Sequence, residues 1–214
     1  MKYYGWVTAI MAAAVLSSSG GTATAQEAHA HIGHVMTGWH DAPDGMGLLP
    51  VAQAEAAIAA QHANLAISKP SDIDSIRLHS GHVLHAIDPV EIEAGPGLGY
   101  GLERAAGGVR AHIGYADGSA DASDNVKLHA EHVAASAQNV TVWTAEIVQL
   151  IRQIETNDTP KHANIMAGRV KHLLACIING CDANSDGTIS WESGEGGLAQ
   201  AEQHMGLMMR GEGL

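Results

Sequence analysis

The segments DSIRLHSGHV (residues 74–83) and DNVKLHAEHV (residues 124–133) carry Asp, Leu, two histidines and Val at matching positions, fifty residues apart. The match continues upstream without a gap. The repeated upstream residues are Gly45, Gly47, Leu48, Ala56, His62 and Ala66, which recur as Gly95, Gly97, Leu98, Ala106, His112 and Ala116. Alanine and glycine are frequent in this chain, so their matches could arise by chance. Three histidines that recur at the same offset are much harder to attribute to chance and indicate an internal repeat.

Each copy of the repeat predicts a helical hairpin. Val51 and Ile58 lie on one stripe at helical spacing, and the turn sequence at residues 69–72 separates this stripe from the next. In the second copy, apolar residues at helical spacing continue as far as Ile154. No strand-like alternation of useful length occurs. We therefore predict an all-α fold, a helical bundle of two repeated hairpins followed by a C-terminal helix–loop–helix.

The N-terminus has the order of an export signal. Lys2 precedes an apolar run over residues 6–16, and a small-residue stretch ends with Ala-Thr-Ala at residues 23–25. We predict a signal peptide over residues 1–25 and a periplasmic or secreted protein that has no membrane association once the signal is removed. The rest divides into a histidine-rich segment (26–48), a duplicated four-helix unit (49–158) and a helix–loop–helix (159–214), packed as one domain.

The net charge and the histidine content indicate which kinds of partner the protein can bind. The 214 residues include 11 Lys and Arg against 23 Asp and Glu, a formal charge of −12, which argues against nucleic acid as a partner. The chain also has 14 histidines and no phenylalanine. Since neutral imidazole is the commonest metal ligand, the histidines point toward metal ions as partners.

The repeated histidines predict transition-metal sites inside the bundle. Residues three apart share a helix face, and these histidines stand close to apolar core positions. A buried polar group without a partner costs about 1–3 kcal/mol, whereas a bound cation would use the nitrogen lone pairs of several imidazoles at once. We expect two equivalent inward triads. They are His62, His79 and His82 in the first copy and His112, His129 and His132 in the second, with His85, His31 and His34 as further candidate ligands.

The function that follows is a metal binder or carrier, with a redox or metal-transfer protein as its partner. All-nitrogen ligation suits copper, zinc, nickel or iron and does not choose among them. The chain has no nucleophile elbow, Walker loop, Rossmann fingerprint or H-E-x-x-H motif, which disfavours an enzyme. Two alternative functions stay open: a b-type haem protein with bis-histidine ligation, and a protein-interaction module whose fold is stabilised by calcium.

An acidic loop follows the predicted helix at residues 161–178. It carries Asp182, Asn184, Asp186 and Thr188 at alternating positions, with a glycine at the sixth. This loop resembles the EF-hand or dockerin-type calcium loop over about a dozen residues, and the resemblance implies calcium bound by these four positions. It departs from that family at its twelfth position, Ser193, so that Glu192 or Glu195 would have to supply the last carboxylate.

Cys176 and Cys181 are the two cysteines of the chain. In an exported protein, a pair with this spacing predicts a local disulfide, with a soft metal site as the alternative. His204 lies among methionines on the last predicted helix, where we expect the side chains to pack against the bundle.

Overall fold

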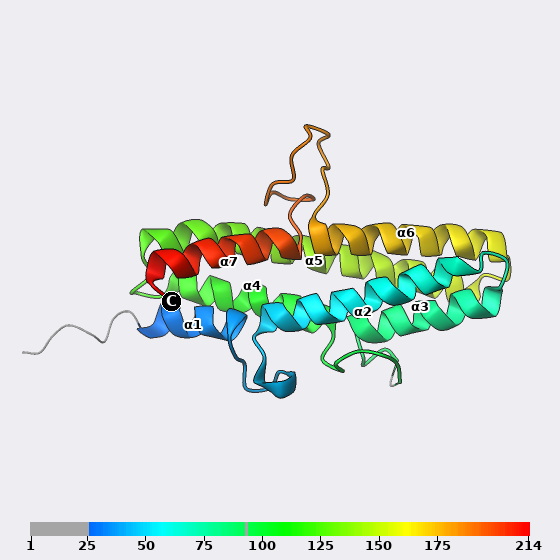
Figure 1. Ribbon diagram of the computed structural model, residues 1–214, viewed down its shortest axis with the longest axis horizontal. Coiled ribbons are helices and arrows are strands. Elements are labelled where there is room, and N and C mark those ends of the chain that lie inside the picture. The colour runs from blue at the N-terminus through cyan, green and yellow to red at the C-terminus, as the bar shows by residue number, and fades with distance from the viewer. Residues whose placement is uncertain (1–25, 93) are drawn as a thin grey trace, which may run out of the picture.

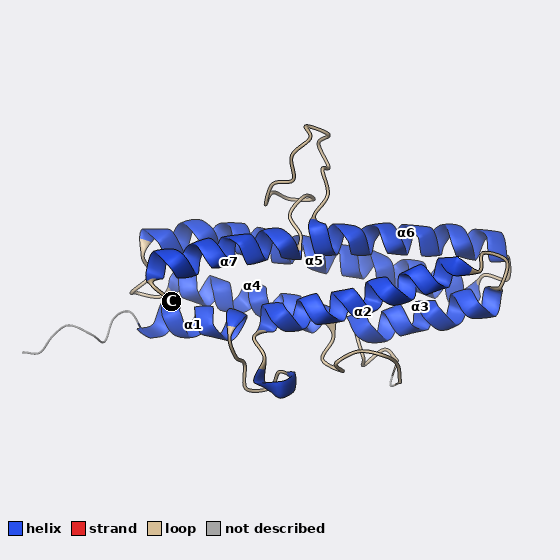
Figure 2. Cartoon of the chain, viewed as in Figure 1, coloured by secondary structure: helices blue, strands red, loops and turns tan. Residues whose placement is uncertain are grey.

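The computed structural model describes residues 26–92 and 94–214, and all the regular structure in them is helical (Figures 1 and 2). The elements are α1 (Gln26–Met36), the 3-10 turn η1 (Pro43–Gly45), α2 (Leu48–Ser68), α3 (Ile73–Ile87), α4 (Leu102–Gly118), α5 (Asp124–Thr156), α6 (Pro160–Asn179) and α7 (Leu198–Glu212). The prediction of an all-α bundle is confirmed. The predicted signal peptide, residues 1–25, lies outside the described residues.

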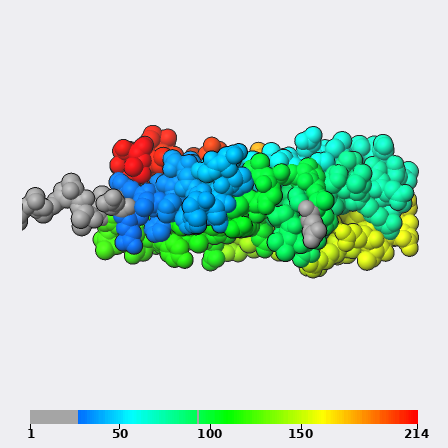
Figure 3. Space-filling model, turned by 90° about the horizontal axis from the view of Figure 1, so that it is seen from below, coloured from blue at the N-terminus to red at the C-terminus, as the bar shows by residue number. Residues whose placement is uncertain are grey.

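Helix α5 runs the length of an elongated bundle (Figure 1). Helices α1, α4 and α7 lie toward one end of the bundle, and α2, α3 and α6 toward the other, with α6 and α7 end to end along one side of α5 (Figure 1). Figure 3 shows the rod shape from a second direction. Within the described residues, no helix combines the length and the apolar character that crossing a membrane requires.

Side-chain caps begin two of the helices. The Asp72 carboxylate accepts a hydrogen bond from the Ser75 backbone N–H (3.0 Å), and the Ser123 hydroxyl oxygen accepts one from the Val126 N–H (3.1 Å). Both caps satisfy a backbone donor that the first turn of a helix leaves unpaired. A short polar residue therefore fixes the start of the second helix in each hairpin, at positions 51 residues apart.

The histidine-rich segment at residues 26–48 is not a loose tail. Ala28, Ile32 and Val35 on α1 are buried in the core, and the Asp121 carboxylate accepts a hydrogen bond from the Glu27 N–H at the start of α1. This arrangement packs α1 against α4. The segment therefore belongs to the folded bundle and presents its histidines on a fixed helix.

Alanine and branched aliphatic side chains fill the interior. Ala52, Ala56 and Ala59 on α2 are fully buried, and such small residues let neighbouring helices approach closely. On α5, Ile147 and Ile151 are likewise fully buried at helical spacing. The centre of the bundle is thus occupied by aliphatic side chains, and the histidine clusters lie elsewhere.

A buried carboxylate holds the glycine-rich linker between α3 and α4. Glu55 on α2 is 0% exposed, and its oxygens accept backbone hydrogen bonds from Leu98, Tyr100 and Gly101 at 3.0–3.2 Å. Three donors satisfy a charge that would otherwise be costly to bury. The linker is therefore tied to α2, and the start of α4 is fixed with it.

Candidate metal centres

Nine histidines gather in three clusters, in each of which the ligand nitrogens lie within 4.8 Å of one another. Cluster A comprises His31, His34 and His112; cluster B comprises His62, His79 and His82; and cluster C comprises His129, His132 and His204. All nine side chains are partly buried.

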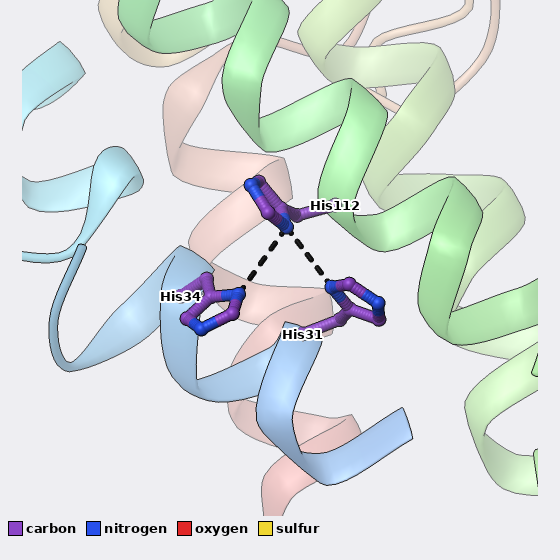
Figure 4. A group of neighbouring side chains, drawn as sticks. All are labelled: His31, His34 and His112. Atoms are coloured by element: carbon purple, nitrogen blue, oxygen red, sulfur yellow. Dashed lines mark hydrogen bonds between the residues drawn. The ribbon is translucent and has the colours of Figure 1, made fainter. Parts of the chain in front are cut away.

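Cluster A joins α1 to α4. His31 and His34 lie one turn apart on α1, and His112 points between them from α4 (Figure 4). The Nδ1 atom of His112 lies 3.0 Å from that of His31 and 3.3 Å from that of His34. The indole of Trp39 packs edge-on against His34 and His112. Cluster A is therefore built from helices that are distant in sequence.

Cluster B joins the two helices of the first hairpin. His79 and His82 lie on α3, and the His62 Nδ1 on α2 lies 3.2 Å from the Nδ1 of each. The turn at residues 69–72 brings α2 and α3 side by side, so these three residues meet through local chain geometry.

Cluster C joins α5 to α7. His129 and His132 lie on α5, and the His204 Nδ1 on α7 lies 3.1 Å from the Nδ1 of each. The ring of Trp191, in the loop before α7, stacks on His132 with centroids 4.1 Å apart and planes 20° apart. The last loop of the chain therefore contributes to the surroundings of this cluster.

The three clusters share one architecture. In each, two histidines three residues apart come from one helix, and a third, which we term the hub, comes from another helix and contacts both through Nδ1. The hubs are His112, His62 and His204. In each pair, the second histidine is directly followed by a buried valine, so the motif H-x-x-H-V occurs three times. The valines are Val35, Val83 and Val133.

The spacing of the nitrogens suits a metal ion. Bonds of about 2.0–2.1 Å from zinc to nitrogen place two ligands of a tetrahedron about 3.3–3.4 Å apart. The six hub distances of 3.0–3.3 Å are close to this value. A ring nitrogen of neutral imidazole carries one proton or one lone pair, so a hub cannot form two full hydrogen bonds with the same atom. A cation would use all three lone pairs.

The hub histidines are held in the neutral form. Burial lowers the pKa of His62, His112 and His204, and the two neighbouring imidazoles of each cluster lower it further. The pKa of His204 falls to about 4. Metal binding requires deprotonated imidazole, so the hubs are ready to ligate at neutral pH without losing a proton.

The expected inward direction of the histidines is wrong. The core stripe of α3 includes Ile76, Ser80 and Val83, each at most 1% exposed, whereas the paired histidines beside them are only partly buried. They lie between neighbouring helices and are partly exposed. An ion held by such partly exposed side chains would be accessible to solvent and to an incoming ligand.

Apolar side chains border the clusters at repeated positions. Leu65 and Tyr115, three residues after the hubs of clusters B and A, are 38% and 59% exposed. Leu78 and Leu128, directly before the paired histidines of clusters B and C, are 56% and 54% exposed. Each cluster therefore has an exposed apolar residue close to it in the sequence.

One of the two predicted histidine triads has the predicted members, and the other does not. Cluster B is the predicted first triad. In the second copy, His112 turns toward α1 and meets His31 and His34, whereas the histidine pair of α5 meets His204. The sequence interpretation missed His204, although its position three residues before Leu207 parallels His62 before Leu65 and His112 before Tyr115.

His85 lies outside the clusters, contrary to its prediction as a ligand. Its side chain is 7% exposed, and its ring Nδ1 lies 2.6 Å from the carbonyl oxygen of Ile92. Because a backbone carbonyl can only accept, this nitrogen donates, and His85 has no partner ligands around it in any of the three clusters. His85 instead holds the segment that follows α3.

The predicted calcium ligands lie in a loop that projects from the bundle between α6 and α7 (Figure 1). Asp182, Asn184, Asp186 and Thr188 are exposed, as is Glu192. The Asp182 carboxylate accepts hydrogen bonds from the Asp186 and Gly187 N–H groups. Glu195, the other predicted carboxylate ligand, is 3% exposed, and its Oε2 accepts hydrogen bonds from the Ser190 N–H and hydroxyl.

Cys176 and Cys181 form a disulfide at the end of α6. His172, one turn before Cys176, places its Nε2 3.7 Å from the Cys176 sulfur. These three side chains form a further group with ligand atoms within 4.8 Å. With the disulfide formed, the sulfurs are not thiolate ligands.

The fold and clusters define a helical-bundle protein with three histidine triads placed so that each could hold a metal ion. Comparison of the chain with family models, with characterised proteins and with solved structures finds no match. The function is therefore argued from the clusters themselves.

Proposed function

We propose that this protein is a binder or carrier of divalent transition metal ions, which it holds at clusters A, B and C. The observation that carries the proposal is that the same arrangement, a histidine pair and a hub, occurs three times on different helix pairs. One buried histidine is commonly explained by packing. Three copies of the same histidine arrangement are better explained if each copy binds the same kind of metal ion.

The ligand set favours zinc, copper(II) or nickel. Three imidazole nitrogens are a standard protein donor set for zinc and leave the fourth position to water or another ligand. Copper(II) binds the same donors more tightly than zinc by the usual order of divalent affinities, so supply would decide which ion is held. The net charge of −12 attracts cations to the chain.

Exchange suits these sites better than permanent structural binding. The nine side chains of the clusters are all partly exposed. Structural zinc sites are closed, with four protein ligands, whereas each cluster supplies three. In this proposal a redox or metal-transfer protein receives the ion, because each three-histidine site leaves a coordination position open to a ligand from that protein.

Haem fits the clusters less well than a metal ion does. Axial ligands of a haem lie on opposite faces of a flat macrocycle, which needs a slot between them. Here the hub ring contacts both paired rings directly, and the ring centroids of cluster B are 4.7–5.6 Å apart. Aliphatic side chains fill the interior where a macrocycle would have to lie.

Calcium in the acidic loop and export of the chain remain part of the proposal. Their support is the sequence of residues 182–188 and of residues 1–25. In this proposal, calcium orders the exposed part of the loop, and Glu195 serves as an anchor beside it.

Elemental analysis and calorimetric titration of the purified protein test the main proposal. We expect three zinc or copper ions per oxidised chain, one for each cluster. The hub variants His62→Ala, His112→Ala and His204→Ala should each lower the count by one. His162→Ala, an exposed histidine outside the clusters, should not change it. Unchanged stoichiometry in all three hub variants would overturn the proposal, and a Soret band in the isolated protein would favour haem.

A further inference from the structure

The group formed by His172, Cys176 and Cys181 lies apart from the three histidine clusters. His172 and Cys176 are one helical turn apart at the end of α6, and Cys181 follows the end of that helix. The His172 side chain is exposed, Cys176 is 3% exposed, and Cys181 is partly exposed. The group therefore has a buried side, formed by Cys176, and a side open to solvent.

Backbone contacts hold the two cysteines together independently of the bond between their sulfurs. The Gly180 N–H donates to the Cys176 carbonyl oxygen (2.7 Å), and the Cys181 N–H donates to the Glu195 carbonyl oxygen (2.8 Å). Gly180 has φ +82°, and a Cβ there would lie 2.4 Å from a methyl carbon of Ile189. The glycine thus turns the chain back across the helix end, and the two cysteine Cα atoms are 5.0 Å apart.

We propose that this group is a redox-controlled metal site. When the disulfide is reduced, the thiolates of Cys176 and Cys181 and the His172 imidazole bind a thiophilic divalent ion such as zinc. This site uses none of the residues of clusters A, B and C, so it stands or falls separately from the proposed function.

The reducing step is an ordinary thiol–disulfide exchange with a dithiol. One thiolate of the dithiol attacks the Cys181 sulfur, which is the more accessible of the two, and Cys176 leaves as a thiolate. The second thiol of the reductant then attacks the mixed disulfide and releases Cys181 as a thiolate. The dithiol loses two electrons and becomes a disulfide, and metal binding displaces the protons that the two protein thiols would otherwise hold.

The distance between His172 and Cys176 already suits such an ion, and breaking the disulfide frees the second sulfur to move to ligand distance. Bonds of about 2.3 Å to sulfur and about 2.0–2.1 Å to nitrogen place these ligand atoms about 3.6 Å apart in a tetrahedron. The observed distance from the Cys176 sulfur to the His172 Nε2 is 3.7 Å. The exposed His172 side leaves a route for the ion and a fourth position for water. Thiolate ligands also give this group a different preference from the all-nitrogen clusters.

Cobalt(II) binding under anaerobic conditions tests the inference on the full chain. The protein is titrated before and after reduction with dithiothreitol, which is removed by gel filtration under argon. We expect reduction to add one cobalt per chain to the oxidised count, whatever that count is. We also expect a sulfur-to-cobalt charge-transfer band in the near ultraviolet, which all-histidine ligation does not produce.

Variants separate the group from the histidine clusters. The Cys176→Ser, Cys181→Ser double variant should bind as the oxidised wild-type protein does under both conditions and show no charge-transfer band. His172→Ala should weaken the added site at least tenfold, whereas His162→Ala on the same helix should leave it unchanged. Reduction that adds no cobalt and no band would overturn the inference. Loss of the helical circular dichroism signal on reduction would overturn it as well, since the backbone would then not hold the cysteines.

Discussion

The indole of Trp191 stacks on the imidazole of His132, with ring centroids 4.1 Å apart. This contact joins the last loop of the chain to the cluster between α5 and α7. Asn139 on α5 fixes the loop in place, since its Nδ2 donates to the carbonyl oxygens of Glu192 and Gly196 and its Oδ1 accepts from the Gly194 N–H. Trp191 is therefore positioned to report on metal at cluster C.

Copper(II) should quench the fluorescence of Trp191 when it binds cluster C, because a paramagnetic ion at a stacked imidazole is very close to the indole. We expect Trp191→Phe to lack this component of quenching in a copper titration. His204→Ala should retain Trp191 emission at copper concentrations that quench the wild-type protein. Trp39→Phe is the matched control, since Trp39 contacts cluster A. Equal fractional quenching in Trp191→Phe and wild-type protein would contradict the assignment.

The metal-free protein should lose stability as the pH falls from about 6.5 toward 4. The pKa of His204 is about 4 in the folded protein against 6.5 as its ordinary value, because burial and the two neighbouring histidines oppose its charge. The unfolded chain therefore binds more protons in this range, and acid favours unfolding. Thermal melts in chelator should show a falling midpoint across this window, with a shallower fall in His204→Gln. A midpoint independent of pH between 7 and 4 would rule this linkage out.

Metal should raise the thermal stability in proportion to the number of intact clusters. A ligand that binds only the folded state at one hundred times its dissociation constant adds about 2.7 kcal/mol per site. We expect each hub variant to lose about one third of the zinc-induced increase in unfolding free energy, and chelator to abolish the increase. Differential scanning fluorimetry with and without zinc measures both effects. A single variant that removed the whole increase would show that the clusters do not act independently.

Replacement of Glu55 should destabilise the fold. Glu55→Ala removes the acceptor for three backbone N–H groups of the linker, and each buried donor left unpaired costs about 1–3 kcal/mol. Because water can reach part of an opened linker, we expect a net loss of about 3 kcal/mol in urea unfolding. Glu155→Ala, an exposed glutamate on α5, should change the unfolding free energy by less than about 0.5 kcal/mol.

The helices were predictable because apolar spacing and turn residues are local properties of the chain. Cluster B was predictable for the same reason, since a short turn brings His62 beside His79 and His82. Clusters A and C were not, because His112 meets histidines 78 and 81 residues earlier and His204 meets histidines 72 and 75 residues earlier. The spacing in the second hairpin is the same as in the first, and the packing of α1 and α4 and of α5 and α7 decides the partners.

The degree of burial of the histidines also could not be predicted from the sequence pattern. His79 lies three residues after Ile76 and four before Val83, a spacing that places it near the core stripe without fixing its side. In the structure, the stripe passes through Ser80, which is 1% exposed, and His79 and His82 on either side of it are only partly buried.

The open side of each histidine cluster has a practical consequence. Metal ions immobilised on a chromatographic resin keep free coordination positions, and clustered accessible imidazoles fill them. We therefore expect the chain to bind such a column without an added histidine tag and to be retained until free imidazole displaces it. Purification on such a resin could load or strip the clusters, so the ion found in a preparation would partly record how the protein was handled.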